Sequence, residues 1–495
     1  MKRYICFIYL LFTLASCEGF LDVNENPNAP IASNLPLSAK LSGALVSTSN
    51  QETLQINQIG GFWGGYWGTN NDGTNLFFDL KTYNGPSLRS QREGIPVWEN
   101  GFNNILFFSL IQEEAELSSN HFYVGTSKVM QGWLFLRLVD FYGNIPFDEA
   151  GQGNEKLQPR YEDGQVVYQK AINLITSGIA DLKQAGPVPA TNGDVMFNGN
   201  VDSWIKFANT VKLRALLRQS ELGNEAYIQE QLALISQEGS GFIQHHAQVN
   251  PGYLNTTGKM NPFWETYYRD VQGNATANYQ NLRPTEFLIS QMQDRNDPRL
   301  SRLYQAIDGE YKGVVFGNSD AGNPKYDRVN TSAFLGAVEN GGPTGLFRSF
   351  NQPSIVMSSF ESFFLQAEAA QRGWIGGSAS DLYNQAIQES FQLLTVPAME
   401  TTAYLSQQEV ALERAEDPIR RIIEQKWLAL NSISSIEAWN DYRRLGWPEY
   451  PATAASGVVG RPNRLMYPET ERGTNLEQVL AQGNDMINEK IWWSR

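Results

Sequence analysis

Apolar residues recur at helical spacing in several long segments of this chain, and this periodicity constrains the fold more than any other feature. In residues 204–215 they fall three or four positions apart and so share one helix face: Trp204, Phe207, Ala208, Val211 and Ala215. Similar stripes run through residues 167–182, 360–370 and 419–430. Because such a helix cannot bury its apolar face alone, these segments must pack on one another. The pattern therefore predicts an all-α protein.

The ends of these segments and their small residues indicate paired helices. Asp417 is placed to cap a helix that begins at Pro418, and Gly373 is placed to end the segment that begins at residue 360. Alanines such as Ala367 and Ala386 suit positions where neighbouring helices cross. Because the spacing is irregular, the chain is predicted to contain degenerate tetratricopeptide-like helix pairs rather than a strict repeat.

Two regions interrupt the helical pattern and are rich in glycine, asparagine and proline. They lie around residues 60–95 and 239–353. Irregular segments of this length inside a folded protein usually have a function. We therefore expect an irregular ligand region beside the helical framework.

The N-terminus has the pattern of an exported, lipid-anchored protein. Lys2 and Arg3 precede an apolar run that is too short for a stable membrane span but suits a signal peptide. The run ends in Leu-Ala-Ser-Cys at residues 14–17, which resembles the lipobox of a bacterial lipoprotein and makes Cys17 the expected lipidation site. The alternative is an ordinary signal peptide with an incidental cysteine.

This interpretation divides the chain into three parts. We expect a removed signal peptide over residues 1–16, a lipidated tether over 17–36 and, over 37–495, a domain that holds the helical framework and the irregular ligand region. The sequence holds two cysteines, Cys6 and Cys17. Since the first would leave with the signal peptide and the second would be acylated, no disulfide, zinc ribbon or thiol nucleophile remains. Stability must then come from burial in a large core.

Charge and motif content argue against several functions. The formal net charge is -14, and an acidic surface repels phosphate backbones, so we expect no nucleic-acid partner. The chain has 3 histidines and no nucleophile elbow, zinc-protease helix or phosphate-binding glycine loop. We therefore predict a protein that is not an enzyme, and we assign no catalytic residue, metal ligand or cofactor. Carboxylates are plentiful, however, and a glycosidase needs only two of them.

The strongest candidate for ligand binding is an aromatic cluster between glycines, made of Trp63, Tyr66 and Trp67. Flanking glycines let the backbone turn tightly and would expose rings that a regular helix buries. Exposed rings can cover the apolar face of a sugar, and the following Asn71 and Asp72 supply hydrogen-bonding groups. The alternative, which the sequence favours equally, is that the rings fill a gap in the core.

A second aromatic cluster lies in the irregular region. Phe263 and Tyr267 are one helical turn apart, as are Trp264 and Tyr268, so the two pairs face in different directions. We include Trp264 and Tyr268 among the predicted ligand-binding residues. Packing is the safer interpretation of the cluster.

Several motifs, taken in order, resemble those of the SusD/RagB family of outer-membrane nutrient-binding lipoproteins. Residues 461–469, RPNRLMYPE, are close to the family's closing Arg-x-x-Tyr-Pro signature. Residues 136–147 resemble its helix-to-loop junction, and residues 98–104 resemble its helix with Trp, Tyr or Phe, and Asn at intervals of four. No single motif is decisive, but together they cover nearly the whole mature chain.

The resemblance implies an all-helical fold with tetratricopeptide-like units beside an irregular region. It also implies a non-enzymatic protein, lipid-anchored at the outer face of the outer membrane. Such a protein would bind an oligosaccharide or a peptide and deliver it to a SusC-like TonB-dependent transporter. Two other classes remain as alternatives: a secreted helical glycan hydrolase, and a helical-repeat scaffold that holds another protein.

Overall fold

The computed structural model describes residues 35–317, 323–342, 345–455, 457–458 and 460–495. The predicted signal peptide, Cys17 and nearly all of the predicted tether lie outside these residues. Within them helices dominate and strands are short, which confirms the predicted all-α class. No helix in this part of the chain combines the length and the apolar character needed to cross a bilayer.

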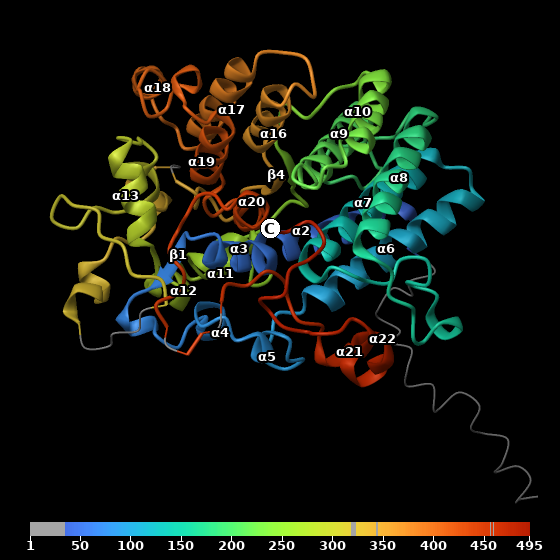
Figure 1. Cartoon of the computed structure of the whole chain (residues 1–495), viewed down its shortest axis with the longest axis horizontal. Coiled ribbons are helices and arrows are strands. Elements are labelled where there is room, and N and C mark those ends of the chain that lie inside the picture. Colours follow the sequence, from blue (N-terminus) through green and yellow to red (C-terminus); the bar gives the residue numbers. More distant parts are fainter. Residues whose placement is uncertain (1–34, 318–322, 343–344, 456, 459) are drawn as a thin grey trace, which may run out of the picture.

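One set of long helices occupies the right-hand side and the centre of Figure 1. Their bounds are α2 Leu37–Asn50, the π-helical segment η2 Gln51–Ile56, α3 Asn57–Trp63, α6 Val97–Leu117, α7 His121–Tyr142, α8 Gly164–Lys183, α9 Val201–Leu217 and α10 Glu225–Glu238. α7 packs against both α6 and α8, and α9 packs against α8. α2 lies along α6 and runs through η2 directly into α3.

A second set of helices, from the last third of the chain, forms the top and the centre of the same view (Figure 1). Their bounds are α16 Ser359–Gln371, α17 Ala379–Leu393, α18 Ala398–Leu405, α19 Pro418–Leu430 and α20 Ser435–Leu445. α16 pairs with α17 and also packs on α9, which joins the two sets, while α20 packs on α3. The predicted cap is present, since the Asp417 carboxylate accepts a hydrogen bond from the Arg420 N–H at 2.9 Å.

Glycine allows α7 and α8 to cross closely. A Cβ on Gly125 of α7 would lie 2.7 Å from the Gly178 carbonyl oxygen of α8, and a Cβ on Gly178 would lie 2.8 Å from the Gly125 carbonyl oxygen. Neither position tolerates a side chain without a shift of the backbone. The two helices therefore touch through their main chains at this point.

The region between α10 and α16 is irregular. Its elements are β2 Ala247–Val249, α11 Pro262–Tyr267, α12 Ala277–Asn281, β3 Leu282–Pro284, α13 Glu286–Asp294, α14 Leu300–Leu303, η5 Pro324–Tyr326, η6 Arg328–Asn330, α15 Ala337–Asn340 and β4 Ser354–Met357. Two antiparallel sheets of two strands tie it to the helices. β1, Trp67–Thr69, pairs with β3, and β2 pairs with β4.

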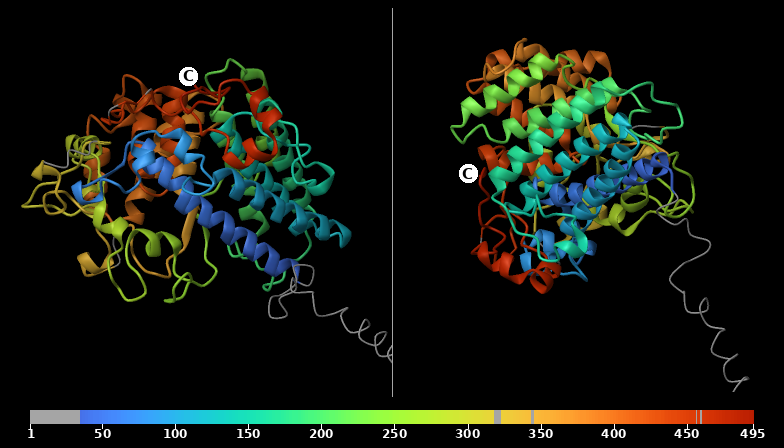
Figure 2. Two further views of the ribbon diagram at one scale, coloured as in Figure 1. Left: turned by 90° about the horizontal axis from the view of Figure 1, so that it is seen from below. Right: turned by 90° about the vertical axis from the view of Figure 1, so that its right-hand side faces the viewer.

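The remaining elements are short. They are η3 Asn71–Gly73, α4 Phe78–Lys81, α5 Gly85–Leu88, η4 Gly153–Glu155, η7 Leu412–Arg414, α21 Glu469–Thr474 and α22 Leu476–Ala481. Figure 2 shows α21 and α22 packed against the outside of the helical body. There the Glu469 N–H donates a hydrogen bond to the Arg89 carbonyl at 3.1 Å, which connects the end of the chain to the segment after α5.

Buried ion pairs lie where α7, α9 and α20 meet. The Glu437 carboxylate accepts hydrogen bonds from Arg137 at 2.6 Å and from Arg218 at 2.5 Å, and it lies 3.4 Å from Arg214. Arg137 also donates two hydrogen bonds, of 3.0 and 2.8 Å, to Glu52 of η2. Each of these side chains is at most 8% exposed. Because charges are tolerated inside a protein only when paired, this network restricts how the helices can cross.

Candidate ligand-binding site

The structure buries the three rings that the sequence singles out between glycines. Trp63, Tyr66 and Trp67 are at most 2% exposed. Trp67 donates its indole hydrogen to Ser432 Oγ at 2.8 Å, and Tyr66 donates its hydroxyl hydrogen to the Trp427 carbonyl at 2.6 Å. The expectation that these rings are exposed is wrong. They pack in the core, and in this conformation none of them presents a ring face to a ligand.

The glycines around these rings provide room for close packing. A Cβ on Gly60 would lie 2.0 Å from the Ile436 nitrogen at the start of α20, and one on Gly61 would lie 2.5 Å from the Trp67 ring. Both glycines are therefore needed because a neighbour approaches closely. Glycine permits either a tight turn or a close approach, and the sequence does not distinguish the two.

Asn71 and Asp72 lie near the surface, where other residues of the chain hold them. The Asn71 amide donates hydrogen bonds to the Asn323 carbonyl at 2.8 Å and to Asp327 Oδ1 at 3.0 Å. Asp72 lies 3.2 Å from Arg328. Neither residue lines the hollows described below, and their role in ligand binding stays a prediction.

The second aromatic cluster is also packed. Ring centroids lie 5.1 Å apart for Phe263 and Tyr267 and 4.6 Å apart for Trp264 and Tyr268, which confirms the pairing predicted from helical spacing. Trp264 is 9% exposed and Tyr268 is fully buried. A ligand role for these two residues therefore stays a prediction, whereas Phe263 lines a cavity.

A surface cleft of about 490 Å³ lies between the α2–η2 helix and residues 251–266, which comprise a loop and the start of α11. Its volume falls within the roughly 300–1,000 Å³ that is usual for small-molecule sites. Val46 and Leu54 of the helix face Tyr253, Leu254 and other loop residues across it. The cleft is therefore large enough for part of an oligomeric ligand.

A few polar groups stand among the apolar walls of the cleft. The Asn50 Oδ1 atom is buried and has no hydrogen-bond donor among the described residues. Glu265 is held in place because its Oε1 accepts a hydrogen bond from the Gly258 N–H at 2.8 Å. Lys259 is exposed at the edge. Apolar walls with a small number of fixed polar groups suit a ligand that carries hydroxyl or amide groups.

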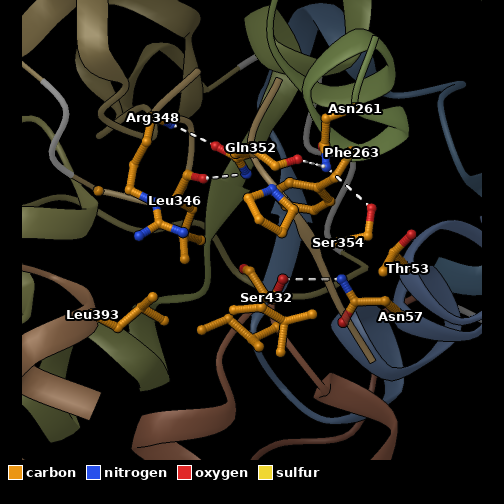
Figure 3. Close-up of a pocket in the computed structure, with 14 residues that line it drawn as sticks. Thr53, Asn57, Asn261, Phe263, Leu346, Arg348, Gln352, Ser354, Leu393 and Ser432 are labelled. Carbon is orange, nitrogen blue, oxygen red and sulfur yellow. Dashed lines mark hydrogen bonds between the residues drawn. The ribbon is translucent and has the colours of Figure 1, made fainter. Parts of the chain in front are cut away.

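A smaller cavity of about 50 Å³ borders the same segment of the chain (Figure 3). Its buried polar residues are Thr53, Asn57, Asn261, Ser354 and Ser432, and its half-buried residues include Arg348, Gln352, Leu393, Ile355 and Ile433. In Figure 3 the Arg348 side chain lies on one side of the cavity, and Thr53 and Asn57 lie on the opposite side. The cavity therefore has both polar and apolar walls and one positive charge.

Hydrogen bonds through Ser354 connect the walls of the cleft and the cavity. The Tyr253 hydroxyl, from the cleft, lies 2.9 Å from Ser354 Oγ. The Asn261 amide donates to the same atom at 3.1 Å and to the Gln352 carbonyl at 2.9 Å. Neighbouring residues of η2 line the two hollows, and π-helical segments occur frequently at functional sites.

Only part of this site follows from the sequence. One wall of the cleft comes from the irregular region of residues 239–353, but none of residues 60–95 lines either hollow. The opposite wall comes from residues 46–54, which sequence reasoning missed. The available signal was the polar run of residues 47–53, STSNQET. The structure buries most of this run in a helix, where polar residues are uncommon.

The described residues of the two hollows lack the pair of carboxylates that a glycosidase uses. Glu265 is the one carboxylate among them. Ser359 donates a hydrogen bond to Glu389 at 2.8 Å and lies 3.1 Å from His246 Nδ1, but it is fully buried and stands between the other two. A catalytic triad instead places the histidine between serine and acid. Nor do three His, Cys, Asp or Glu residues of the described chain gather as a metal site would require.

A helical-repeat framework with an open cleft beside it defines the class as a helical binding protein. The chain belongs to the SusD-like family described as "Starch-binding associating with outer membrane", which matches residues 38–468.

Solved structures of SusD homologues have the same fold. One from Bacteroides fragilis shares 21% identity over 92% of this chain and 98% of its own, with a TM-score of 0.73. A chitin-binding homologue from Flavobacterium johnsoniae also shares 21% identity, over 92% and 98% of the two chains, with a TM-score of 0.73. A SusD-like protein of Bacteroides thetaiotaomicron covers 93% of this chain and 99% of its own at 21% identity and a TM-score of 0.71. No match was found among curated protein sequences.

Proposed function

We propose that this protein binds nutrient oligomers, oligosaccharides or peptides, at the cell surface and delivers them to a SusC-like TonB-dependent transporter. The observation that carries the proposal is the cleft of about 490 Å³ beside α2 and η2, in a chain of this family. The Asn50 carbonyl oxygen supports it, since a buried acceptor without a donor is unfavourable until a ligand supplies one. Chitin binding by the Flavobacterium homologue makes a glycan the first ligand to test.

The binding part of the proposal can be tested with the soluble chain that lacks residues 1–17. We expect a glycan and peptide array to return at least one oligomer. Asn50→Ala should then weaken binding of that oligomer by about 5- to 20-fold, as for the loss of one or two hydrogen bonds. The matched control is Asn103→Ala, because Asn103 is exposed on α6 and does not line the cleft. Equal affinities of both variants would contradict the cleft as the site.

Turnover of the same oligomer separates binding from hydrolysis. We expect no new reducing ends when the protein is incubated with an oligosaccharide that it binds. Their appearance, if abolished by Glu265→Gln, would contradict the proposal and favour the hydrolase class.

Tests of the lipid anchor and of the transporter partner require the full chain in its own membrane. We propose that Cys17 is lipidated, so Cys17→Ala should move the protein from the outer-membrane fraction to the soluble fraction. Gentle detergent extraction should recover the unaltered protein with a large barrel protein. Recovery of a different partner class, with no barrel, would favour the scaffold alternative.

A further inference from the structure

Arg348 is a half-buried arginine that lines the small cavity and lacks a partner. Its own backbone N–H is bound to Gln352 Oε1 at 2.8 Å, which fixes the start of its side chain. No ion pair or hydrogen bond joins its guanidinium to any residue that the structure describes. Burial lowers the pKa of Arg348, and no neighbouring carboxylate counteracts this effect. No nitrogen of this guanidinium is both fully buried and unpaired, so the group stays within reach of a ligand in the cavity.

Two arginines that are fully buried show how this chain can supply acceptors without a carboxylate. Arg283 donates to Thr331 Oγ1, the Leu282 carbonyl and the Arg328 carbonyl at 2.9, 2.7 and 3.2 Å. Arg443 donates to the Asn463 carbonyl at 2.6 Å and also to Asn440. The fold thus finds internal oxygens for these guanidinium groups. Arg348 has none, so its donors remain free for a ligand.

The amide side chains of the cavity, unlike the guanidinium, are committed to internal hydrogen bonds. Asn57 donates to the Ser432 carbonyl at 3.0 Å and accepts from the Ser435 N–H at 3.0 Å. Gln352 accepts from the Arg348 N–H and donates to the Leu346 carbonyl at 3.0 Å. These bonds hold the walls rigid, and they leave the guanidinium as the main source of free donors in the cavity.

The cavity has room for a small group beside this cation. Its volume of about 50 Å³ exceeds the roughly 10–15 Å³ that one water molecule needs, yet it is too small for a sugar ring or a whole amino acid. Part of the half-buried rim is apolar, formed by Leu393, Ile355 and Ile433, and these side chains would limit the access of water to a bound group. A charged hydrogen bond in such surroundings is stronger than one in water.

We propose that this cavity is a carboxylate subsite, in which Arg348 binds an anionic group of the nutrient oligomer. A planar carboxylate fits the guanidinium fork, which can donate two parallel hydrogen bonds to it. The inference rests on the proposed function and narrows it to acidic ligands. Two sources offer this group, a uronic acid in an oligosaccharide and the C-terminus of a peptide. The chain is acidic overall, with a net charge of -14, so general electrostatic attraction does not explain such a preference.

Two matched pairs of probes test the subsite by calorimetry on the soluble chain. The first pair is trigalacturonic acid and its neutral counterpart, galactotriose. The second pair is a short apolar peptide with a free C-terminus and the same peptide with a C-terminal amide. We expect the acid of at least one pair to bind at least about 10-fold more tightly than its neutral partner, as for a hydrogen bond between charged groups. The pair that responds identifies the source of the carboxylate.

The variant Arg348→Gln should remove this preference, weakening the acidic probe about 10- to 100-fold and leaving the neutral probe within about 2-fold. Arg348→Lys, which keeps the charge but loses the fork, should retain an intermediate affinity. Arg92→Gln is the control, because Arg92 is exposed, does not line the cavity and removes the same charge. Thermal melting of each variant checks that it is folded.

Three results would overturn the inference. One is equal binding of acid and neutral probes; another is an acid preference that survives in Arg348→Gln or disappears in Arg92→Gln. The third is the failure of every acidic probe to bind. If neutral oligomers from the array still bind in these cases, the proposed function stands and the carboxylate subsite alone is rejected. If the array also finds no ligand, both are rejected.

Discussion

The junction of α7, α9 and α20 buries its arginines and the small cavity half-buries Arg348, but the two places surround the guanidinium groups in opposite ways. At the junction of α7, α9 and α20, Glu437 lies between Arg137 and Arg218, with hydrogen bonds of 2.6 and 2.5 Å. At the cavity, the guanidinium of Arg348 has no acceptor among the described residues. A paired buried charge restricts how helices pack, whereas an unpaired one is available to a ligand. The difference separates residues that hold the fold together from residues that can bind.

The largest expected effect on the free energy of unfolding is at the junction of α7, α9 and α20. Glu437→Gln removes the charge shared by three arginines while keeping the volume of the side chain. We expect a loss near the upper end of the roughly 3–5 kcal/mol that follows the breaking of a buried ion pair. Chemical denaturation measures it. Glu93→Gln, an exposed position, should change stability by less than about 0.5 kcal/mol and serves as the control. A loss below about 1 kcal/mol at Glu437 would mean that the network does not determine the packing.

The aromatic core should respond almost as strongly. Trp67→Ala empties a fully buried site and leaves Ser432 Oγ without its indole donor, so we expect a loss of about 3–4 kcal/mol. Phe78→Ala, at a residue that is 51% exposed, should cost far less. If Trp67→Ala instead weakened ligand binding and left the unfolding transition unchanged, the ring would belong to the site after all.

Acid should weaken another buried ion pair, the one between Glu368 of α16 and Arg444 of α20. Burial raises the pKa of Glu368, but the charges of Arg444, Arg372 and Lys426 outweigh burial and hold the pKa at about 2. Since the ordinary value is 4.5, the folded state keeps this carboxylate ionised more strongly than the unfolded state. Its contribution is present above about pH 4.5 and is lost as the pH falls towards 2, an effect on the order of 3 kcal/mol.

The variant Glu368→Gln checks that contribution. Its stability should fall less between pH 4.5 and pH 2 than that of the unaltered protein, as followed by urea denaturation at each pH. Glu52 has the opposite effect on the pH dependence, because burial raises the pKa of its carboxyl despite the charge of Arg137. Its protonation in acid therefore offsets part of the loss that is due to Glu368. An equal loss of stability between pH 4.5 and pH 2 in the two proteins would contradict the assignment to Glu368.

The smallest effect on stability is expected at the cavity. Arg348→Gln removes no ion pair, so its free energy of unfolding should stay within about 0.5 kcal/mol of the unaltered protein. The comparison between the two regions predicts a change in binding without a change in stability at this position. A loss above about 1.5 kcal/mol would place Arg348 with the structural arginines.

Sequence reasoning succeeded where the information was local. The apolar stripes and the cap at Asp417 depend on residues a few positions apart, so helices such as α9 and α19 could be predicted from them. It left two alternatives open for the rings at Trp63, Tyr66 and Trp67, since their burial depends on α19 and α20, far along the chain. Nor does the sequence show that Arg137 is paired with carboxylates and that Arg348 is not.

The sequence by itself determined the helical class, the helix ends and the family resemblance, because each is a pattern of neighbouring residues or of ordered motifs. Only the tertiary structure decided which aromatic rings are buried, which arginines are paired and where the cleft lies. Burial and pairing depend on side chains that meet across the whole chain, such as Glu437 with Arg137, and no local pattern records which residues will meet.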